Sequence, residues 1–406
     1  MKKIAVFGST GSIGTQTLSV AGFHPDEFEV YAIAANKNAE QVVRSANEFH
    51  PKFIGMYDEA AAREVSERCP GITVVSGGEV NSLAALSEVD IVVNAVSGFA
   101  GLFPLLSALR AGKTVALANK ESIVCGHVVV NRALAEFGGR ILPVDSEQSA
   151  IFQCLAAGRS EDVRSLILTA SGGMFRNAST DELARVTPQM ALRHPTWSMG
   201  GKITIDSSTL FNKGLELMEA GWLFDIEPNR IEILIHPQSV VHSMVEFCDG
   251  AVFAQMSPPD MRLAIQYALT YPHRITSQLP RLDLAALHSL TFEKPDCTRF
   301  PAISLAYEAF RDGSSLPIAY NSANETAVEL FVRGCIGFTD IAKCVEYSME
   351  RIPLSLVGSE MCIRDRKSAP LTTYFILIKK PAGWPANASE RKHYDNCLHT
   401  SCDTYS

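Results

Sequence analysis

Residues 2–14 read KKIAVFGSTGSIG, and this stretch decides the fold of the first part of the chain. Residues 4–7 are apolar, as in a strand buried on both faces, and Gly8, Gly11 and Gly14 follow them. In a strand–turn–helix unit, such glycines allow a tight turn and let the backbone approach a pyrophosphate at the helix N-terminus. The stretch therefore predicts a dinucleotide-binding turn, although an ordinary turn between strand and helix can show the same pattern.

The residues that follow continue this alternation of strand and helix. Candidate strands cover residues 30–35, 54–56, 91–95, 114–118 and 141–144, and candidate helices cover residues 39–49, 60–68, 103–110 and 122–137. Such alternation is typical of a parallel sheet with crossover helices. We therefore predict an α/β fold in which residues 1–146 form a Rossmann-type nucleotide-binding domain.

The end of the second predicted strand indicates which dinucleotide binds. An NAD enzyme places an acid there to accept a hydrogen bond from the ribose 2′-hydroxyl, but no carboxylate precedes Glu40 in this chain. Lys37 can instead bind a 2′-phosphate, which favours NADPH. A lysine that is merely solvated in the turn is the plainer alternative.

The pattern changes after residue 146. Strands are predicted over residues 163–170, 202–205 and 231–235, a helix over 207–223, a hairpin over 240–256 around Asp249-Gly250, and a helix over 258–269. We predict an α+β catalytic domain over residues 147–270, with a lid loop at 171–201, and a linker over 271–302. Helices over 302–311 and 321–351 predict a C-terminal helical domain at 303–353. Residues 354–406 show no amphipathic period, so we predict an unrelated tail, artefactual or disordered, and an incomplete helical domain.

Composition limits the classes of partner. A chain of 406 residues exceeds one hydrophobic core, and its net charge of −8 argues against general affinity for nucleic acid or anionic membranes. An anionic substrate therefore needs a local basic pocket. The ten cysteines show no paired spacing and no apolar run reaches membrane-spanning length, so we expect a reduced cytoplasmic protein whose partner is a small molecule.

Asp145 and Glu147 follow the sixth predicted strand, at the sheet edge where ligands bind in open α/β folds. Two carboxylates so close repel each other unless a cation neutralises them, and oxygen-only ligands favour Mg²⁺ or Mn²⁺. The alternative is a helix N-cap formed by Asp145 or Ser146, and the spacing alone does not separate the two.

The predicted helix that starts at Ser207 carries Asn212, Lys213 and Glu216 on neighbouring faces. With the free N–H groups of a helix N-terminus at Ser207, these side chains form a plausible phosphate clamp, and Glu216 can be a third metal ligand. The alternative is an amphipathic helix with a Lys–Glu pair on its surface.

Two glycine-rich stretches can belong to the same site. Ser171-Gly172-Gly173 follows a strand and is a second candidate anion-binding turn. The stretch from His194 to Gly201 has the composition of a mobile cover, and Trp197 can pack over a substrate or serve as a core anchor.

Taken together, six motifs resemble the 1-deoxy-D-xylulose 5-phosphate reductoisomerase family. They are GSTGSIG (8–14), ANKES (118–122), PVDSEQSA (143–150), TASGG (169–173), HPTWSMGGKITIDSSTLFNKGLELMEA (194–220) and HPQSVVHSMVEFCDG (236–250). The resemblance runs from Lys2 to about Arg351. It implies a homodimer that uses NADPH and Mg²⁺, Mn²⁺ or Co²⁺ to convert 1-deoxy-D-xylulose 5-phosphate into 2-C-methyl-D-erythritol 4-phosphate for isoprenoid synthesis.

The resemblance also implies a role for each matching residue. Metal ligands are Asp145, Glu147 and Glu216; phosphate contacts are Ser171, Ser207, Asn212 and Lys213; other substrate contacts are Lys120, Ser146 and His194; and Trp197 is the lid tryptophan. The catalytic group consists of Lys120, Asp145, Glu147, His194 and Glu216. The NADPH contacts are Thr10, Gly11, Ser12, Ile13, Asn36, Lys37, Asn38, Asn119, Glu121 and Gly200, with Asn36 standing where a glycine is expected.

Two rivals remain at this point. The first is another NADP-dependent dehydrogenase with the same glycine spacing; a semialdehyde dehydrogenase would need an activated cysteine, whereas Cys125, Cys154 and Cys248 lie in apolar sequence and are expected to be buried. The second is a non-catalytic NADPH-binding chain, inactive because of its altered C-terminus.

Overall fold

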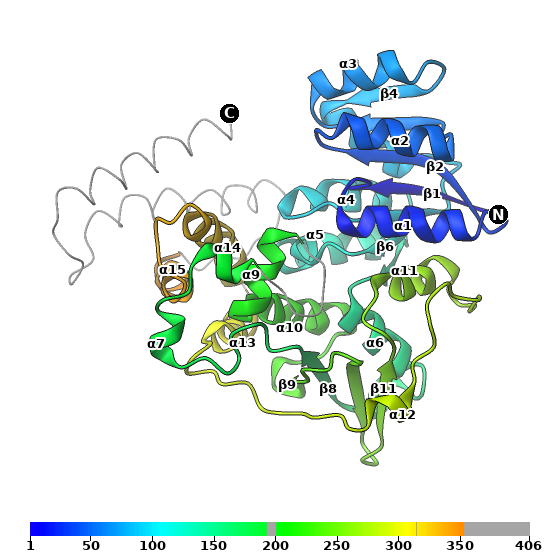
Figure 1. Ribbon diagram of the computed structural model, residues 1–406. Helices are drawn as coiled ribbons and strands as arrows, with labels where there is room; N and C mark the ends of the chain where they lie inside the picture. The colour runs from blue at the N-terminus through cyan, green and yellow to red at the C-terminus, as the bar shows by residue number, and fades with distance from the viewer. Residues whose placement is uncertain (193–199, 314, 353–406) are drawn as a thin grey trace, which may run out of the picture. The chain divides into compact units, whose positions relative to one another are not determined.

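The computed structural model describes residues 1–192, 200–313 and 315–352 (Figure 1). By its internal contacts the chain divides into two units, Met1–Thr169 with Glu219–Phe292 and Ala170–Met218 with Glu293–Ser406. The division falls inside one helix, α10 (Phe211–Phe224), so residues of both units lie on a single continuous element.

The first unit is built on a parallel sheet of seven strands. Their order is β4-β3-β2-β1-β5-β6-β7, and every neighbouring pair is parallel. The strands are β1 (Lys2–Phe7), β2 (Phe28–Ala35), β3 (Phe53–Met56), β4 (Thr73–Ser76), β5 (Ile91–Asn94), β6 (Thr114–Leu117) and β7 (Arg140–Pro143). The strand order reverses beside β1, which places the glycine turn after β1 at the switch point where such sheets bind ligands.

Helices connect these strands as the sequence predicts. They are α1 (Ser12–Phe23), α2 (Ala39–Phe49), α3 (Glu59–Arg68), α4 (Leu102–Arg110), α5 (Lys120–Phe137) and α6 (Ser146–Leu155), with 3₁₀ turns at Gly77–Ala85 and Phe99–Gly101. Ile4, Ile33, Ile54 and Val93 are fully buried in the core between sheet and helices. The strand β4 is absent from the prediction because it is short, lies at the sheet edge and is only partly buried, so its apolar signal is weak.

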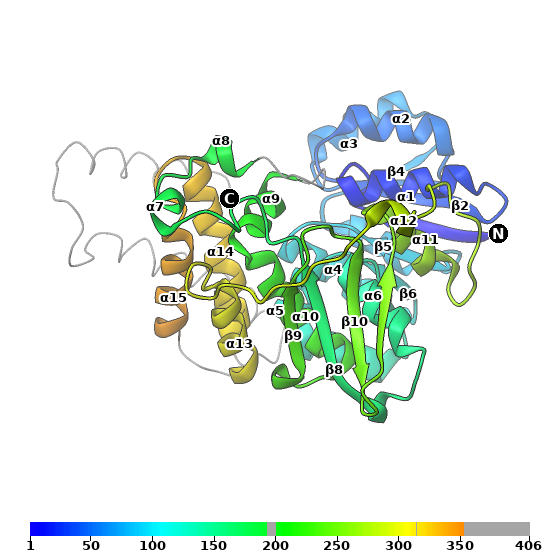
Figure 2. The ribbon, with the colours of Figure 1, turned by 60° about the horizontal axis from the view of Figure 1, so that its bottom comes forward.

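A second sheet of four strands also belongs to the first unit. It contains β8 (Val163–Ala170), β9 (Ile231–Ile235), β10 (Val241–Phe247) and β11 (Val252–Met256), in the order β11-β10-β8-β9 (Figure 2). The predicted hairpin at Asp249-Gly250 is confirmed by the antiparallel pairing of β10 with β11. The helix α6 packs against β10 and β11, and α11 (Met261–Thr270) packs against α1.

The remaining described elements are mostly helices. They are α7 (Thr180–Leu183), α8 (Pro188–Ala191), α9 (Gly201–Thr209), α12 (Leu284–Leu287), α13 (Ala302–Asp312), α14 (Leu316–Val332) and α15 (Asp340–Arg351), with 3₁₀ turns at Ser160–Asp162 and Pro228–Arg230. In the second unit, α14 packs against α9, α13 and α15. The α/β fold class with a Rossmann-type sheet, a second sheet and a helical C-terminal region is therefore confirmed.

Three of the sequence predictions for local structure are wrong. Residues 202–205 are helical rather than extended, because α9 packs on α14 and its threonine hydroxyls bond to helix carbonyls, as Thr204 does to Gly200 at 3.0 Å. The predicted helix 207–223 is two helices, because Leu210 adopts a left-handed conformation with φ 64° between α9 and α10. The predicted helix 321–351 is also two helices, with Gly334 at φ 75° in the turn between α14 and α15.

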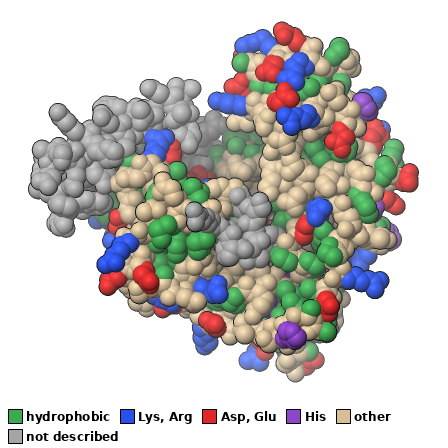
Figure 3. All heavy atoms as spheres, in the orientation of Figure 1, with side chains coloured by type: hydrophobic (Ala, Val, Ile, Leu, Met, Phe, Trp, Pro, Cys, Tyr) green, Lys and Arg blue, Asp and Glu red, His purple; other side chains and the backbone are tan. Residues whose placement is uncertain are grey.

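The described residues have an ordinary surface of mixed charge (Figure 3). None of their helices combines the length and apolar character that a membrane crossing requires. On the face drawn in Figure 3, acidic and basic side chains are interspersed, as the balanced composition leads one to expect.

Candidate active site

The glycine turn after β1 has the geometry of a dinucleotide-binding turn. Gly8 adopts φ +78°, and a side chain there would place its Cβ 2.4 Å from the Ala95 carbonyl oxygen. A Cβ on Gly14 would lie 2.1 Å from the Gly8 carbonyl, so α1 contacts the turn closely. No side chain caps the N-terminus of α1 at Gly11, which suits the N–H groups of this first turn to an anion.

The residues expected on the nicotinamide dinucleotide side occupy three places. Thr10, Gly11, Ser12 and Ile13 form the turn and the start of α1, and Asn36, Lys37 and Asn38 are exposed beyond the end of β2. Lys37 is 76% exposed, with its Nζ 4.0 Å from a carboxylate oxygen of Asp58, so it is available to a phosphate. Asn38 is the N-cap of α2, where its side chain accepts from the Gln41 N–H. Gly200 is the N-cap of α9, in the second unit.

Hydrogen bonds to neighbouring groups of the chain fix the side chain of Asn119. Its side chain caps α5 by accepting from the Ser122 N–H and donates to the Gly98 carbonyl and to Glu121, each at 2.9 Å. A side chain on Gly101 would collide with it at 2.6 Å. Asn119 therefore fixes the start of α5, and with it the position of Lys120.

Lys120 and Asp145 form an ion pair at the carboxyl ends of β6 and β7. The Lys120 Nζ lies 2.6 Å from an Asp145 oxygen, and the two side chains are 6% and 15% exposed. Asp145 is also the N-cap residue of α6, but its side chain accepts from the adjoining Ser146 N–H at 3.2 Å. The N-cap alternative is therefore present in the structure, and the same carboxylate also faces Lys120.

The helices α6 and α10 are joined by a buried hydrogen bond. Gln148 Nε2 donates to Glu219 at 3.2 Å, and both side chains are at most 1% exposed. Glu147 precedes Gln148 on α6 and accepts from the Ser146 hydroxyl, and Glu216 lies one turn before Glu219 on α10. The bond therefore links α6 to α10 next to residues that carry two of the predicted acids.

The structure brings the three predicted acids together. One carboxylate oxygen from each of Asp145, Glu147 and Glu216 lies within 4.8 Å of the others. Three carboxylates at this separation repel one another, and oxygen-only donors suit a hard divalent cation such as Mg²⁺ or Mn²⁺. The three carboxylates therefore fit the expected divalent metal ion.

Asn212 and Lys213 converge on the third of these acids. The Asn212 amide and the Lys213 ammonium each contact the Glu216 carboxylate, and Lys213 and Glu216 are 4% and 1% exposed. The alternative of a Lys–Glu pair on the surface is therefore wrong. A buried ammonium beside an amide is a group that can neutralise an anion.

Ser171 lies in the turn after β8, and Ser207 lies in the last turn of helix α9. Gly173 follows Ser171 at φ +68°, and a side chain on it would meet the Ser207 carbonyl and the Ser208 Cα at 2.7 Å. The turn after β8 therefore packs directly on the end of α9. The position of Ser207 corrects one expectation: it lies within α9 rather than at a helix N-terminus, so α9 does not present free terminal N–H groups there.

His194 and Trp197 lie outside the described residues. The sequence prediction of a lid therefore stays a prediction, with Gly200 as its described end.

Sequence reasoning missed two contacts that hold this site together. These are the Gln148–Glu219 bond and a bond from Asn324 of α14 to Asp206 of α9, at 2.8 Å. Neither pair is close in sequence, so no local spacing points to them. The sequence feature that could have indicated these contacts is a polar residue on an otherwise apolar helix face.

The cysteines do not support the semialdehyde dehydrogenase rival. Cys125 and Cys154 are buried as expected, and burial raises the pKa of Cys154 to about 11, which disfavours the nucleophilic thiolate. Cys248 is exposed, contrary to the expectation, because it lies at the tip of the β10–β11 hairpin.

Comparison with known proteins decides the family. Three family models match the chain: 1-deoxy-D-xylulose 5-phosphate reductoisomerase at residues 4–127, its C-terminal domain at 141–224, and the DXP reductoisomerase C-terminal domain at 256–372. The chain belongs to the 1-deoxy-D-xylulose 5-phosphate reductoisomerase family. The third match ends at residue 372, whereas the resemblance carried by the motifs extends only to about Arg351.

Individual reductoisomerases agree with this assignment. The chain is 50% identical to the enzyme of Pelotomaculum thermopropionicum over 357 residues, which is 86% of this chain and 92% of that one. The solved reductoisomerase of Zymomonas mobilis in complex with NADPH has a TM-score of 0.87 and 40% identity, covering 92% of this chain and 98% of that one. A DOX-P reductoisomerase in complex with NADPH, fosmidomycin and magnesium has a TM-score of 0.89 and 38% identity, covering 94% and 100%.

Proposed function

We propose that this chain converts 1-deoxy-D-xylulose 5-phosphate into 2-C-methyl-D-erythritol 4-phosphate for isoprenoid synthesis, with NADPH and Mg²⁺ or Mn²⁺. Family membership supports the activity. The observation that carries the assignment of the site is the convergence of three carboxylates within 4.8 Å of one another. These acids are partly or fully buried, and a divalent cation would offset the repulsion among them.

Asp145, Glu147 and Glu216 are the proposed ligands of the cation. When bound, a divalent cation polarises a carbonyl and stabilises alkoxide charge, and NADPH supplies the hydride. Lys120, 2.6 Å from Asp145, brings an ammonium to the same place and can orient a substrate hydroxyl or hold a proton. Ser146 and the lid residue His194 are proposed as further substrate contacts.

The substrate phosphate is proposed to bind in the second unit. Ser171 belongs to the turn that packs on the end of α9, where Ser207 lies, and Asn212 and Lys213 follow in the first turn of α10. A hydroxyl, an amide and an ammonium make charge-assisted hydrogen bonds to a phosphate. Binding of this remote group then supplies energy that orients the reacting end of the sugar. Trp197 is the proposed cover.

NADPH is proposed to bind at the turn after β1. The uncapped start of α1 suits the pyrophosphate, and the exposed Lys37 suits the 2′-phosphate. Asn36 and Asn38 are proposed to flank that phosphate. Asn119, Glu121 and Gly200 are proposed to contact the nicotinamide end. We also propose that the chain acts as a cytoplasmic homodimer.

The test is NADPH oxidation with 1-deoxy-D-xylulose 5-phosphate and Mn²⁺, in the wild type and in Glu216→Gln. Loss of one ligand charge is expected to lower kcat/KM by at least about 100-fold and to weaken Mn²⁺ binding. Glu232→Gln is the matched control, because Glu232 is exposed on β9 and does not belong to the cluster of three acids. An unchanged rate in Glu216→Gln removes the metal assignment.

Two further arms separate the rivals. Turnover that persists after EDTA treatment and dialysis would favour a metal-independent NADP dehydrogenase. Tight NADPH binding without turnover of 1-deoxy-D-xylulose 5-phosphate would favour a non-catalytic chain. Light scattering at assay concentration tests the homodimer, since a monomer would contradict it.

A further inference from the structure

The helix α14 carries a polar sequence that the proposed function does not use. Residues 321–325 read Asn-Ser-Ala-Asn-Glu, and Asn321, Ser322 and Asn324 are at most 2% exposed. Burying an amide costs free energy unless it gains hydrogen bonds, so three such residues on one helix need a reason. That reason can be sought in the elements that α14 contacts.

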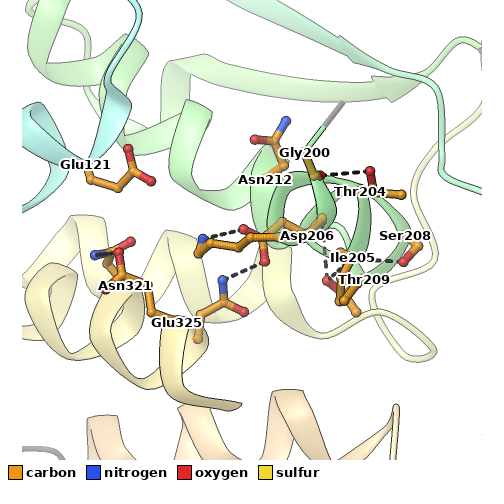
Figure 4. A network of polar contacts seen from close by, with 12 residues as sticks. Glu121, Gly200, Thr204, Ile205, Asp206, Ser208, Thr209, Asn212, Asn321 and Glu325 are labelled. Carbon is orange, nitrogen blue, oxygen red and sulfur yellow. Dashed lines mark hydrogen bonds and ion pairs between the residues drawn. The ribbon is translucent and has the colours of Figure 1, made fainter. Parts of the chain in front are cut away.

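The first contact of α14 is with Asp206, at the centre of the polar network in Figure 4. Asp206 is 2% exposed; one carboxylate oxygen accepts from Asn324 Nδ2 at 2.8 Å, and the other lies 2.5 Å from Lys202 Nζ. Both oxygens are thus used by donors from different elements, α14 and the start of α9. The arrangement orients α9 at the residue immediately before Ser207.

The second contact is between Tyr320 and Gly214. A side chain on Gly214 would place its Cβ 2.0 Å from the Tyr320 hydroxyl, so α10 and α14 are separated by no more than a glycine at this point. Tyr320 is fully buried, donates to the Ala302 carbonyl at 3.1 Å and packs against the Phe211 ring at 5.1 Å between centroids. Its hydroxyl is therefore fixed, and it cannot yield to a larger residue.

These two contacts bracket residues 207–213, which we call the clamp segment. Asp206 precedes the segment and Gly214 follows it, and each lies against α14. Between them, Leu210 interrupts the helices with its left-handed backbone, so the segment has no continuous helical hydrogen bonding to keep its shape. An external support is needed to hold Ser207, Asn212 and Lys213 in one arrangement.

We infer that α14 is this support, and that Asp206 and Asn324 are positioning residues that fix the clamp segment for the substrate phosphate. The inference rests on the proposed function, since it assumes that this segment binds the phosphate. Helix α14 would then contribute to phosphate recognition without touching the phosphate. A purely structural role predicts instead that all ligands are affected in proportion to lost stability.

The experiment measures binding of inorganic phosphate and of Mn²⁺ separately, each by calorimetry on the full chain. Asn324→Leu is expected to weaken phosphate binding at least about 10-fold and to raise KM for 1-deoxy-D-xylulose 5-phosphate, while NADPH affinity changes less than about 2-fold. Mn²⁺ affinity is expected to change less than phosphate affinity, although Asn212 and Lys213 also contact Glu216. The exchanged pair Asp206→Asn with Asn324→Asp restores an amide facing a carboxylate, and phosphate affinity is expected to return in part.

A second pair of variants keeps the test decisive if Asn324→Leu does not fold. Gly214→Ala is expected to weaken phosphate binding. Adding Tyr320→Phe removes the hydroxyl at 2.0 Å but leaves the ring Cζ and the Ala306 Cβ at 2.9 Å, so it is expected to recover part of the loss. Equal weakening of phosphate, Mn²⁺ and NADPH binding, or no change in phosphate binding, overturns the inference. Phosphate binding is measured without turnover, so an inactive wild type would count against the proposed function alone.

Discussion

The ion pair between Lys120 and Asp145 places a cationic side chain next to the proposed metal ligands. In the absence of an ion, this ammonium offsets part of the repulsion among three acids. A divalent cation and Lys120 therefore neutralise the same negative charge. Removal of the Lys120 ammonium is therefore expected to strengthen cation binding and to slow turnover.

Lys120→Met is the corresponding variant. With the ammonium gone, the acid cluster is more negative, so Mn²⁺ is expected to bind several-fold more tightly, while kcat falls about 100-fold because a donor to the substrate is lost. Calorimetry and steady-state kinetics measure the two effects. Lys113→Met is the control, because Lys113 bonds to the Ser87 and Val89 carbonyls away from the acids. Weaker Mn²⁺ binding in Lys120→Met would contradict this account.

His127 gives the fold a pH dependence that is independent of the site. Its ring stacks on Trp222 with centroids 4.0 Å apart, and burial lowers the pKa of His127 to about 4. The folded state thus holds the neutral ring, whereas the unfolded chain takes up a proton below about pH 6.5. Stability is therefore present above pH 6.5 and is lost as pH falls toward 4.

His127→Phe keeps the stacking and removes the titration. The wild type is expected to lose about 2 kcal/mol from this residue between pH 7 and pH 5, and the variant is expected to lose correspondingly less. Urea unfolding at both pH values measures the difference. Equal losses in the two proteins would show that His127 does not titrate as inferred.

At the residue scale, the sequence identified the candidate site residues more accurately than it identified their arrangement in space. Asp145, Glu147 and Glu216 could be chosen from carboxylate spacing and helix periodicity, and they lie together. The bond from Asn324 to Asp206 could not be predicted, because it joins residues 118 positions apart. The placement of Ser207 was wrong because residues 202–205, predicted as a strand, belong to α9, which begins at Gly201.

At the scale of elements, the glycine turn between β1 and α1 depends on the lack of one side chain. Gly8→Ala would force a residue into φ +78° and bring its Cβ against the Ala95 carbonyl. We expect NADPH affinity to fall at least about 10-fold, measured by fluorescence titration. Gly78→Ala is the control, since nothing lies within 4 Å of its added Cβ. Unchanged NADPH binding in a folded Gly8→Ala protein would exclude this turn as the binding element.

The end of α2 allows a prediction about stability alone. His50 is exposed and occupies the C-cap in a left-handed conformation, with φ 48° and ψ 51°. His50→Gly is expected to raise the free energy of unfolding by about 1 kcal/mol, because glycine adopts this conformation without steric cost. Chemical denaturation measures the gain. His50→Ala retains the cost and should show none; an equal gain in both variants would contradict the argument.

The elements that the sequence predicted well are those with long, strongly patterned signals. The strand 163–170 and the helix 39–49 have the predicted bounds. Residues 202–205 alternate polar and apolar side chains as a strand does, but packing of α9 on α14 overrides that local pattern. Tertiary contacts of this kind cannot be inferred from a window of one sequence.

For the whole molecule, the sequence prediction that residues beyond 353 form an unrelated tail stays a prediction. Its test is limited trypsin digestion followed by mass spectrometry. The first cleavages are expected at basic residues such as Arg364, Arg366 and Lys367, leaving a fragment that begins at residue 1. Cleavage of this region no faster than cleavage after the exposed Arg159 would contradict the prediction.

The contact between Gly173 and Ser207 has a consequence for how a ligand acts on the whole chain. Residues 174–206 leave from one side of this contact and return to the other, so they form a closed loop whose ends already touch. The entropy of closing that loop is largely spent before any ligand arrives. An anion bound by both ends of this loop would stabilise its closed form further. A ketose without that anionic group would therefore react slowly as well as bind weakly.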